Sequence, residues 1–229
     1  MHVALVTVGD EILAGDTVNT NAAWLGKRLA DRGVDVERVT VVPDRVEEIA
    51  CVVSEYRTEY DAVIVTGGLG PTHDDLTLAG VAAALDREIE RNEEALSWLT
   101  AEGGYTREDL TSGTANLPRG ARPLHNEVGV APGAVVEGIY VLPGVPSEMK
   151  AMFESVEEEF AGEPRYTDFV YTTEPESALV PRLAEVRKRF DVSVGSYPGD
   201  GVRLKLTGTD EETVEAAAEW LREHVELDE

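Results

Sequence analysis

The stretch Ala62–Thr77, which reads AVIVTGGLGPTHDDLT, decides the fold of this chain. It opens with an uninterrupted apolar run, which is typical of a strand buried in a parallel sheet. Three glycines follow, and the apolar residues Leu76, Ala79 and Ala83 have the spacing of a helix. A glycine turn between a strand and a helix N-terminus suits an anion, because backbone N–H groups approach it closely and the helix dipole is positive there. The stretch therefore predicts an α/β sheet with a phosphate-bearing ligand at this turn.

Two adjacent carboxylates, Asp74 and Asp75, lie in the same loop and would repel a phosphate. Mg²⁺ is usually held by one or two carboxylates together with substrate phosphates. The pair therefore predicts a divalent metal between the loop and its ligand, with metal-assisted chemistry. The glycines alone identify no ligand, because they match neither the dinucleotide fingerprint nor the P-loop.

The length and composition indicate a globular protein. A chain of 229 residues can hold one large or two modest domains, and 42% hydrophobic content is ordinary. No apolar stretch approaches the ~20 residues of a membrane helix, and the N-terminus leads directly into a strand rather than a signal peptide. The single cysteine, Cys51, excludes a disulfide framework, and we expect it to be a small buried side chain. We expect a cytoplasmic protein with no membrane partner.

The charge of the chain is unusual. It carries 45 acidic against 20 basic residues, a net charge of −25, and the acids are scattered along its whole length. A well-solvated surface would explain part of this excess, but its even spread favours a halophilic protein, adapted to a cytosol with very high salt. A surface this negative also argues against nucleic acid as a main partner.

Removing salt is expected to destabilise the folded protein. With a charge of −25, repulsion within the compact state is screened at molar KCl, whereas at 0.01 M salt it extends over ~30 Å. Melting followed by circular dichroism from molar to millimolar KCl measures the effect. An unchanged melting temperature would contradict the halophilic interpretation.

Strands and helices alternate along the first third of the chain. Apolar strands are expected at 3–8, 34–42 and 62–65, with helices at about 21–32 and after the turn Pro43-Asp44. This order predicts a three-layer, doubly wound, mostly parallel sheet with right-handed crossovers. A polar helical region at 92–114 and a hairpin of 134–136 with 139–142 follow.

A second, smaller domain is expected after the linker Gly162–Pro164. Strands at 169–172, 192–196 and 202–206 and helices at 176–190 and 211–226 give the order βαββα. Such a unit forms a small α+β domain. The predicted division is residues 1–163 and residues 164–229.

Three further segments follow predicted strands, where open α/β sheets bind ligands. They are Gly9–Glu11 with Asn19–Asn21 behind it, Asn126–Gly133, and Pro143–Glu148. Each segment also has a purely structural interpretation. In the first, Asn19 or Thr20 would be a helix N-cap, and the second would be an ordinary turn-rich loop. In the third, Ser147 would be an N-cap and Glu148 a first-turn acid that interacts favourably with the helix dipole.

Together these motifs resemble one family. GDEIL at 9–13, NTN at 19–21, TGGLGPT-x-DD-x-T at 66–77 and LPGVPSEM at 142–149 are similar to the N-terminal domain of CinA-type competence/damage-inducible proteins, related to the MoaB/MogA/MoeA molybdopterin-binding fold. The βαββα unit resembles the KH-like domain that follows in that family. Many relatives also append a nicotinamide-nucleotide amidase domain, which we do not expect in a chain that stops at Glu229.

The resemblance implies a site for a nucleotide or pterin phosphate and, for CinA-type members, metal-dependent pyrophosphatase activity on ADP-ribose-like dinucleotides. It assigns Asp75, Asp74 and Glu11 to catalysis and the two aspartates to the metal. His73 departs from the usual pattern and is expected to be a solvated loop residue. The residues implied to bind substrate are Asp10, Asn21, Thr66, Gly67, Gly68, Gly70, Thr77, Asn126, Gly144, Ser147 and Glu148.

The KH-like resemblance does not imply RNA binding. The close glycines there, in Gly199–Gly201, flank an acid in a strand-to-strand turn rather than forming the GXXG loop that clamps RNA. Residues 166–229 carry 15 acids and 7 bases, so an assembly role, such as a homodimer, is expected instead.

The sequence is compatible with three functions. The first is a metal-dependent pyrophosphatase, the second a molybdopterin-binding or transfer protein with molybdopterin as its ligand, and the third a non-catalytic scaffold that keeps only the fold. The joint presence of the acidic and glycine motifs favours the first.

Overall fold

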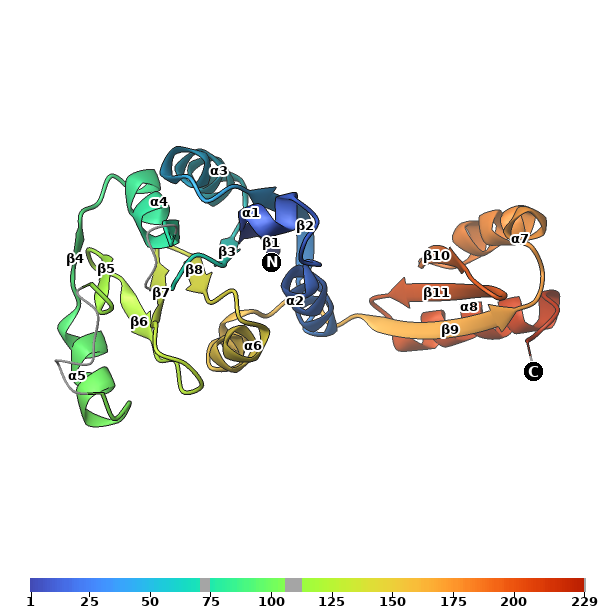
Figure 1. Cartoon of the computed structure of the whole chain (residues 1–229). Coiled ribbons are helices and arrows are strands. Elements are labelled where there is room, and N and C mark those ends of the chain that lie inside the picture. The colour runs from blue at the N-terminus through green and yellow to red at the C-terminus, as the bar shows by residue number, and fades with distance from the viewer. Residues whose placement is uncertain (71–74, 106–112, 229) are drawn as a thin grey trace. The chain divides into compact units, whose positions relative to one another are not determined.

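A computed structural model describes residues 1–70, 75–105 and 113–228. The chain divides into two compact units, one formed by Met1–Ala30 and Val34–Gly162 and the other by Asp31–Gly33 and Glu163–Glu229. Figure 1 shows the helices and strands that make up each unit.

The larger unit is built on a six-stranded sheet with the order β2-β1-β3-β8-β7-β6. Its strands are β1 His2–Val8, β2 Asp35–Val42, β3 Ala62–Thr66, β6 Arg122–Leu124, β7 Gly133–Val136 and β8 Ile139–Leu142. Its helices are α1 Asp10–Leu13, α2 Thr20–Asp31, α3 Val46–Glu59, α4 Thr77–Ala84, α5 Glu93–Ala101, α6 Pro146–Glu154 and the short η1 Glu157–Glu159. Two short strands, β4 Ile89–Arg91 and β5 Asn116–Pro118, form a separate antiparallel pair.

The sheet is parallel from β2 through β1 and β3 to β8, and β7 and β6 extend it with antiparallel pairing. The predicted hairpin of β7 and β8 is confirmed. Its turn residues Glu137 and Gly138 both have positive φ, 47° and 76°, as a two-residue hairpin turn of type I′ requires. The mostly parallel, doubly wound fold class is therefore confirmed.

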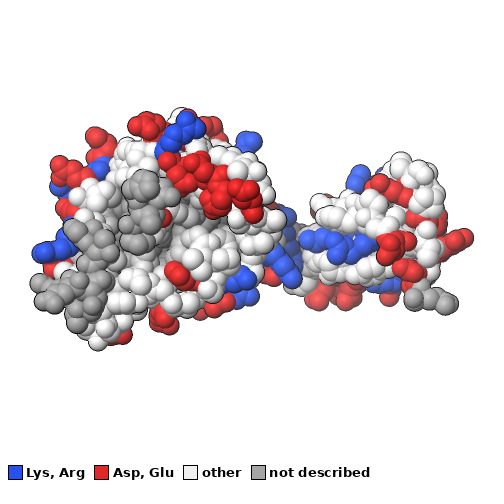
Figure 2. Space-filling view, viewed as in Figure 1, with Lys and Arg blue, Asp and Glu red and all other residues white. Residues whose placement is uncertain are grey.

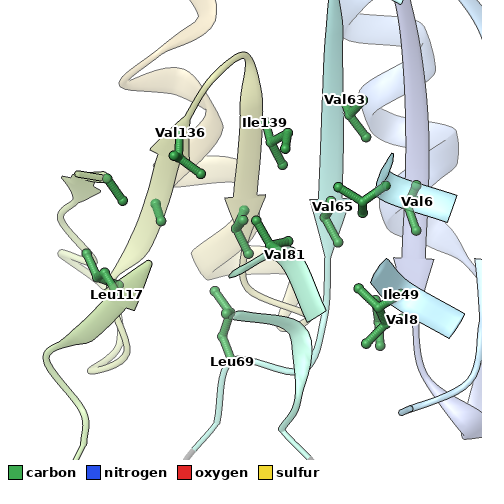
Figure 3. Close-up of a cluster of buried hydrophobic side chains, with 14 of the residues drawn as sticks. Val6, Val8, Ile49, Val63, Val65, Leu69, Val81, Leu117, Val136 and Ile139 are labelled. Atoms are coloured by element: carbon green, nitrogen blue, oxygen red, sulfur yellow. The ribbon is translucent and has the colours of Figure 1, made fainter. Parts of the chain in front are cut away.

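Alternate residues of the central strands bury opposite faces of the sheet, because side chains alternate along a strand. On β1, Val6 and Val8 pack toward α3 and α4 with Ile49 and Val81 (Figure 3). Leu5 packs on the opposite side with α2 and α6. Figure 1 shows the three layers, with α3 and α4 on one side of the sheet and α2 and α6 on the other.

The prediction that Cys51 is buried was wrong. Cys51 is exposed, because α3 turns Ile49, Val53 and Tyr56 toward the sheet and leaves Cys51 on its solvent side. A helix places residues three and four apart on one face, and Cys51 falls outside that spacing. Its neighbours in sequence are therefore not its neighbours in the core.

The smaller unit has the predicted order βαββα. Its elements are β9 Tyr166–Thr172, α7 Glu176–Arg189, β10 Ser193–Pro198, β11 Val202–Gly208 and α8 Glu211–His224. The strands form an antiparallel sheet with the order β10-β11-β9. Leu204 and Leu206 of β11 are fully buried against Leu179 of α7 and Leu221 of α8. Within the described part of the chain, none of the helices combines the length and apolar character needed to cross a membrane.

Candidate functional site

A cavity of about 250 Å³ lies in the larger unit, beside the carboxyl ends of β1 and β3. This is the edge at which parallel α/β sheets bind ligands. The predicted residues Glu11, Asn21, Thr66, Gly67, Gly68, Asp75 and Gly144 line it together. The other lining residues are Thr7, Val8, Gly9, Ile12, Thr17, Val18, Asn19, Thr20, Asp44 and Pro146.

The glycine turn brings bare backbone to the cavity wall. Gly67 has φ +99° and donates its N–H to the carbonyl of Leu142, which fastens the turn to the end of β8. A Cβ on Gly67 would lie 2.2 Å from the Val8 carbonyl oxygen, and one on Gly68 would lie 2.4 Å from Thr77 Oγ1. Both positions therefore require glycine, and the fully buried Thr77 supports the turn from behind rather than lining the cavity.

Asp75 closes the glycine loop. Its Oδ1 accepts a hydrogen bond of 2.7 Å from the backbone N–H of Gly70, and its side chain lines the cavity. Helix α4 begins at Thr77 with Leu76 as its N-cap and no side-chain cap, so Asp75 does not occupy the cap position. Gly70 lies outside the cavity lining, and its backbone N–H orients the Asp75 carboxylate. Asp74 and His73 lie outside the described residues.

Three carboxylates come to the same cavity from separate segments: Glu11 on α1, Asp44 after β2, and Asp75 before α4. Asp44 Oδ2 accepts a hydrogen bond of 2.8 Å from the backbone N–H of Asp10, which ties the end of β2 to α1. The Asp10 side chain is exposed and outside the lining. The residues of the described cavity wall include no lysine, arginine or histidine.

The donor chemistry of this wall fits a hard divalent cation, which prefers oxygen ligands. Among the residues the structure describes, no three His, Cys, Asp or Glu side chains converge to hold an ion by themselves. A cation at this wall would need oxygens from its ligand as well, which is how Mg²⁺ is commonly bound with phosphates.

Neutral polar side chains form the wall next to the glycine turn. Asn19 Oδ1 accepts from the N–H of Ala22 at 3.1 Å, so the prediction of an N-cap here is confirmed, and its Nδ2 donates to Thr7 Oγ1 at 3.0 Å. Asn21, only 8% exposed, donates through Nδ2 to the Gly144 carbonyl at 2.7 Å. These bonds join α2 to β1 and to the segment after β8, and so they fix the shape of the cavity.

Besides Asp10, Gly70 and Thr77, three more residues predicted to bind substrate lie outside this cavity: Asn126, Ser147 and Glu148. Asn126 organises the loop after β6, because its Oδ1 accepts from Gly129 N–H at 2.8 Å and its Nδ2 donates to Glu148 Oε2 at 2.7 Å. Ser147 is exposed and does not cap α6, whose N-cap is Val145. The capping alternative for Ser147 was therefore wrong, and Glu148 holds a loop.

Asp44 and Thr7 were missed as site residues. The sequence indicates only a turn at Asp44, although this residue directly follows Val42-Pro43 at the end of a strand, as the other candidate segments follow theirs. Thr7 lies inside β1, and its polarity in an otherwise apolar strand was the available signal.

Known families match both units of the chain. Residues 4–162 match a family model described as a probable molybdopterin binding domain, and residues 164–229 match one described as the middle domain of FAD synthase. The larger unit is accordingly a MoaB/MogA-like α/β domain, followed by a small domain with antiparallel strands.

Individual relatives identify the family more specifically. The structure of the protein CinA with unknown function from Thermoplasma acidophilum is 38% identical and covers 69% of this chain and 97% of that chain, with a TM-score of 0.64. Proteins from Pyrococcus furiosus and Archaeoglobus fulgidus are 41% and 38% identical; each match spans 97% of this chain, and 96% and 97% of the two relatives. The chain belongs to the CinA-type family.

Proposed function

We propose that the cavity binds a dinucleotide of the ADP-ribose class and hydrolyses its pyrophosphate with a divalent metal. The observation that carries this proposal is the composition of the wall: Glu11, Asp44 and Asp75 surround a glycine turn suited to a phosphate, and the described lining has no basic side chain.

The electrostatics explain why a metal belongs to the proposal. Two unit charges 4 Å apart interact by about 1 kcal/mol in bulk water and about 4 kcal/mol near a protein surface. A pyrophosphate beside these carboxylates would be repelled by such amounts. Lysine or arginine can offset this repulsion, whereas the charged side chains of the described wall are all carboxylates, which recruit a cation instead.

The roles follow from the positions of the acids. Asp75, oriented by the Gly70 N–H, would hold the metal on the glycine-turn side, with Asp74 as the second predicted ligand. Asp44, fixed by the Asp10 N–H, offers a further oxygen from the opposite segment. A bound divalent metal would neutralise the phosphates and polarise the attacking water. Glu11 would accept that water's proton while the P–O bond breaks, releasing AMP and ribose 5-phosphate.

A molybdopterin-binding function is the second candidate, and one observation favours it: the model that matches residues 4–162 is described as a probable molybdopterin binding domain. The pterin's phosphate would use the same glycine turn, and no bond would be broken. A scaffold that retains only the fold is the third possibility.

A ligand screen separates the three functions. ADP-ribose, related dinucleotides and molybdopterin would be offered to the full chain with Mg²⁺ or with EDTA, and both AMP formation and the melting temperature measured. Metal-dependent AMP release from ADP-ribose is the expected result. Stabilisation by the pterin alone would support the binding protein, and no response to any compound would support the scaffold.

A further inference from the structure

Within the described residues of the smaller unit, one face of the sheet is covered by α7 and α8, and neither helix covers the other face. Strand pairing aligns Tyr197 with Arg203 and Arg203 with Tyr171, and in the next rows Lys205 pairs with Gly195 and with Phe169. Because side chains alternate along a strand, these residues share one face while Leu204 and Leu206 point to the helices. We call it the open face; its residues are Thr167, Phe169, Tyr171, Ser193, Gly195, Tyr197, Arg203, Lys205 and Thr207.

Large aromatic side chains are exposed on the open face. Phe169 is 37% exposed, Tyr171 52% and Tyr197 47%. The rings of Phe169 and Tyr171 lie 6.5 Å apart, inclined by 34°, so they do not cover each other. The ring of Tyr197 lies over Gly195, where a Cβ would approach it to 2.9 Å. A lone exposed aromatic residue needs no explanation, but three on one sheet face mark an interaction surface.

Two of the nine open-face positions are cations, Arg203 and Lys205. Arg203 lies over the rings of Tyr197 and Phe169, at 5.0 and 5.7 Å from their centroids. Neither Arg203 nor Lys205 forms an ion pair with any carboxylate in the described part of the chain, whereas arginines such as Arg28 and Arg182 do. Asp200 lies in the turn after β10. Leu227 forms a bridge with Thr172, and the backbone N–H of Asp228 donates to the Tyr171 carbonyl, so Asp228 shares the row of Tyr171 at the edge of this face. Basic side chains are visible over β11 in Figure 2.

The net charge of the whole chain does not reflect the composition of the open face. A net charge of −25 argues against a partner rich in phosphate, yet the open face combines exposed planar rings with two cations that form no ion pair in the described part of the chain. A ligand that joins planar bases to phosphates complements both features.

We propose that the open face is a stacking platform for single-stranded nucleic acid. Bases would stack on Tyr171, Phe169 and Tyr197, and phosphates would pair with Arg203 and Lys205. Because the rings occupy separate places on the sheet, one base cannot cover them all, which favours a strand over a free nucleotide. This mode differs from the GXXG groove of KH modules, since it uses the sheet face itself.

The test measures binding of a fluorescent eight-nucleotide RNA to the full chain by anisotropy, between 0.1 and 0.5 M KCl. We expect a dissociation constant of about 10⁻⁴ to 10⁻⁶ M at the lower salt concentration. Tyr171→Ser and Phe169→Ser are each expected to weaken binding at least about fivefold, because stacking is lost. Lys188→Gln, on the exposed side of α7, is the matched control and should bind like the wild type.

A charge variant tests the phosphate contacts independently. Arg203→Gln with Lys205→Gln is expected to reduce the slope of log K against log salt by about 1.4, two contacts at ~0.7 each for a single strand. Wild-type protein that binds no RNA, variants that bind like the wild type, or a mononucleotide that binds as tightly as the octamer would each overturn the proposal. So would self-association in sedimentation that Tyr171→Ser abolishes, because the face would then be an interface between copies.

Discussion

Gly67→Ala is expected to destabilise the larger unit by about 3 kcal/mol and to abolish ligand binding at the cavity. Gly67 has φ +99°, which an L side chain rarely adopts, and its Cβ would lie 2.2 Å from the Val8 carbonyl oxygen. That atom belongs to the end of β1 and cannot turn aside as a flexible side chain could. The turn must therefore move away from β1, and the cavity wall moves with it.

Thermal melting of the wild type and Gly67→Ala measures this effect, and Gly26→Ala supplies the control. Gly26 lies within α2, and a Cβ there would meet nothing within 4 Å. Replacing a helical glycine by alanine stabilises by roughly 0.5–1 kcal/mol, so the same chemical change is expected to act in opposite directions at the two positions. Equal melting temperatures for Gly67→Ala and the wild type would show that the turn is not held as described.

Asp75→Asn is expected to reduce turnover of an ADP-ribose-type dinucleotide by about 10²-fold or more. Orientation and charge stabilisation at a metal supply several kcal/mol, and each 1.36 kcal/mol is about tenfold in rate. Asparagine retains an oxygen that can accept from the Gly70 N–H, so the loop keeps its shape while the metal loses a full charge. Folding should be nearly unchanged.

Two further variants make this result interpretable. Asp75→Ala also removes the bond to Gly70, and about 1 kcal/mol of stability should be lost with it. Asp86→Asn is the charge-matched control: it is exposed, lies beyond the end of α4, and has φ 52°, which asparagine tolerates. Full activity in Asp75→Asn would end the metal assignment for this residue and direct attention to Glu11 and Asp44.

Much of the fold could be predicted because local signals agree with the global structure. The apolar run before Gly67 became β3, with all five of its residues buried, and the Glu137-Gly138 pair became a hairpin turn. The βαββα order of residues 166–224 also agrees with the prediction. Each of these signals lies within a short segment of the chain, so it can be recognised from a single sequence.

The parts that could not be predicted depend on which side of an element a residue faces, or on pairing between distant segments. Cys51 and Ile49 are two residues apart, yet only Ile49 reaches the core. The short antiparallel pair of β4 and β5 could not be predicted, because the residues of β4 are all exposed and three residues are too few to show a periodic pattern.

Site residues within the recognised motifs could be predicted from the sequence, whereas a residue that reaches the cavity only through the pairing of strands could not. Glu11, Asn21 and Asp75 do meet at one cavity, but Asp44 joins them because β2 lies beside β1, a neighbour relation that strand order alone decides. Asn126 and Glu148 were placed in the site from their motifs, and the structure shows them bonded to each other outside its lining.

Binding of Mn²⁺ to the full chain, followed by electron paramagnetic resonance, tests most directly whether the acidic wall serves a metal and a phosphate ligand together. We expect one Mn²⁺ per chain, bound at least about tenfold more tightly when a non-hydrolysable methylene analogue of ADP-ribose is present, because coupling between two ligands is reciprocal. Asp75→Asn should lose most of that affinity, whereas Asp86→Asn should keep it. Absence of Mn²⁺ binding with the analogue present, or equal binding in Asp75→Asn and the wild type, would contradict the proposed site.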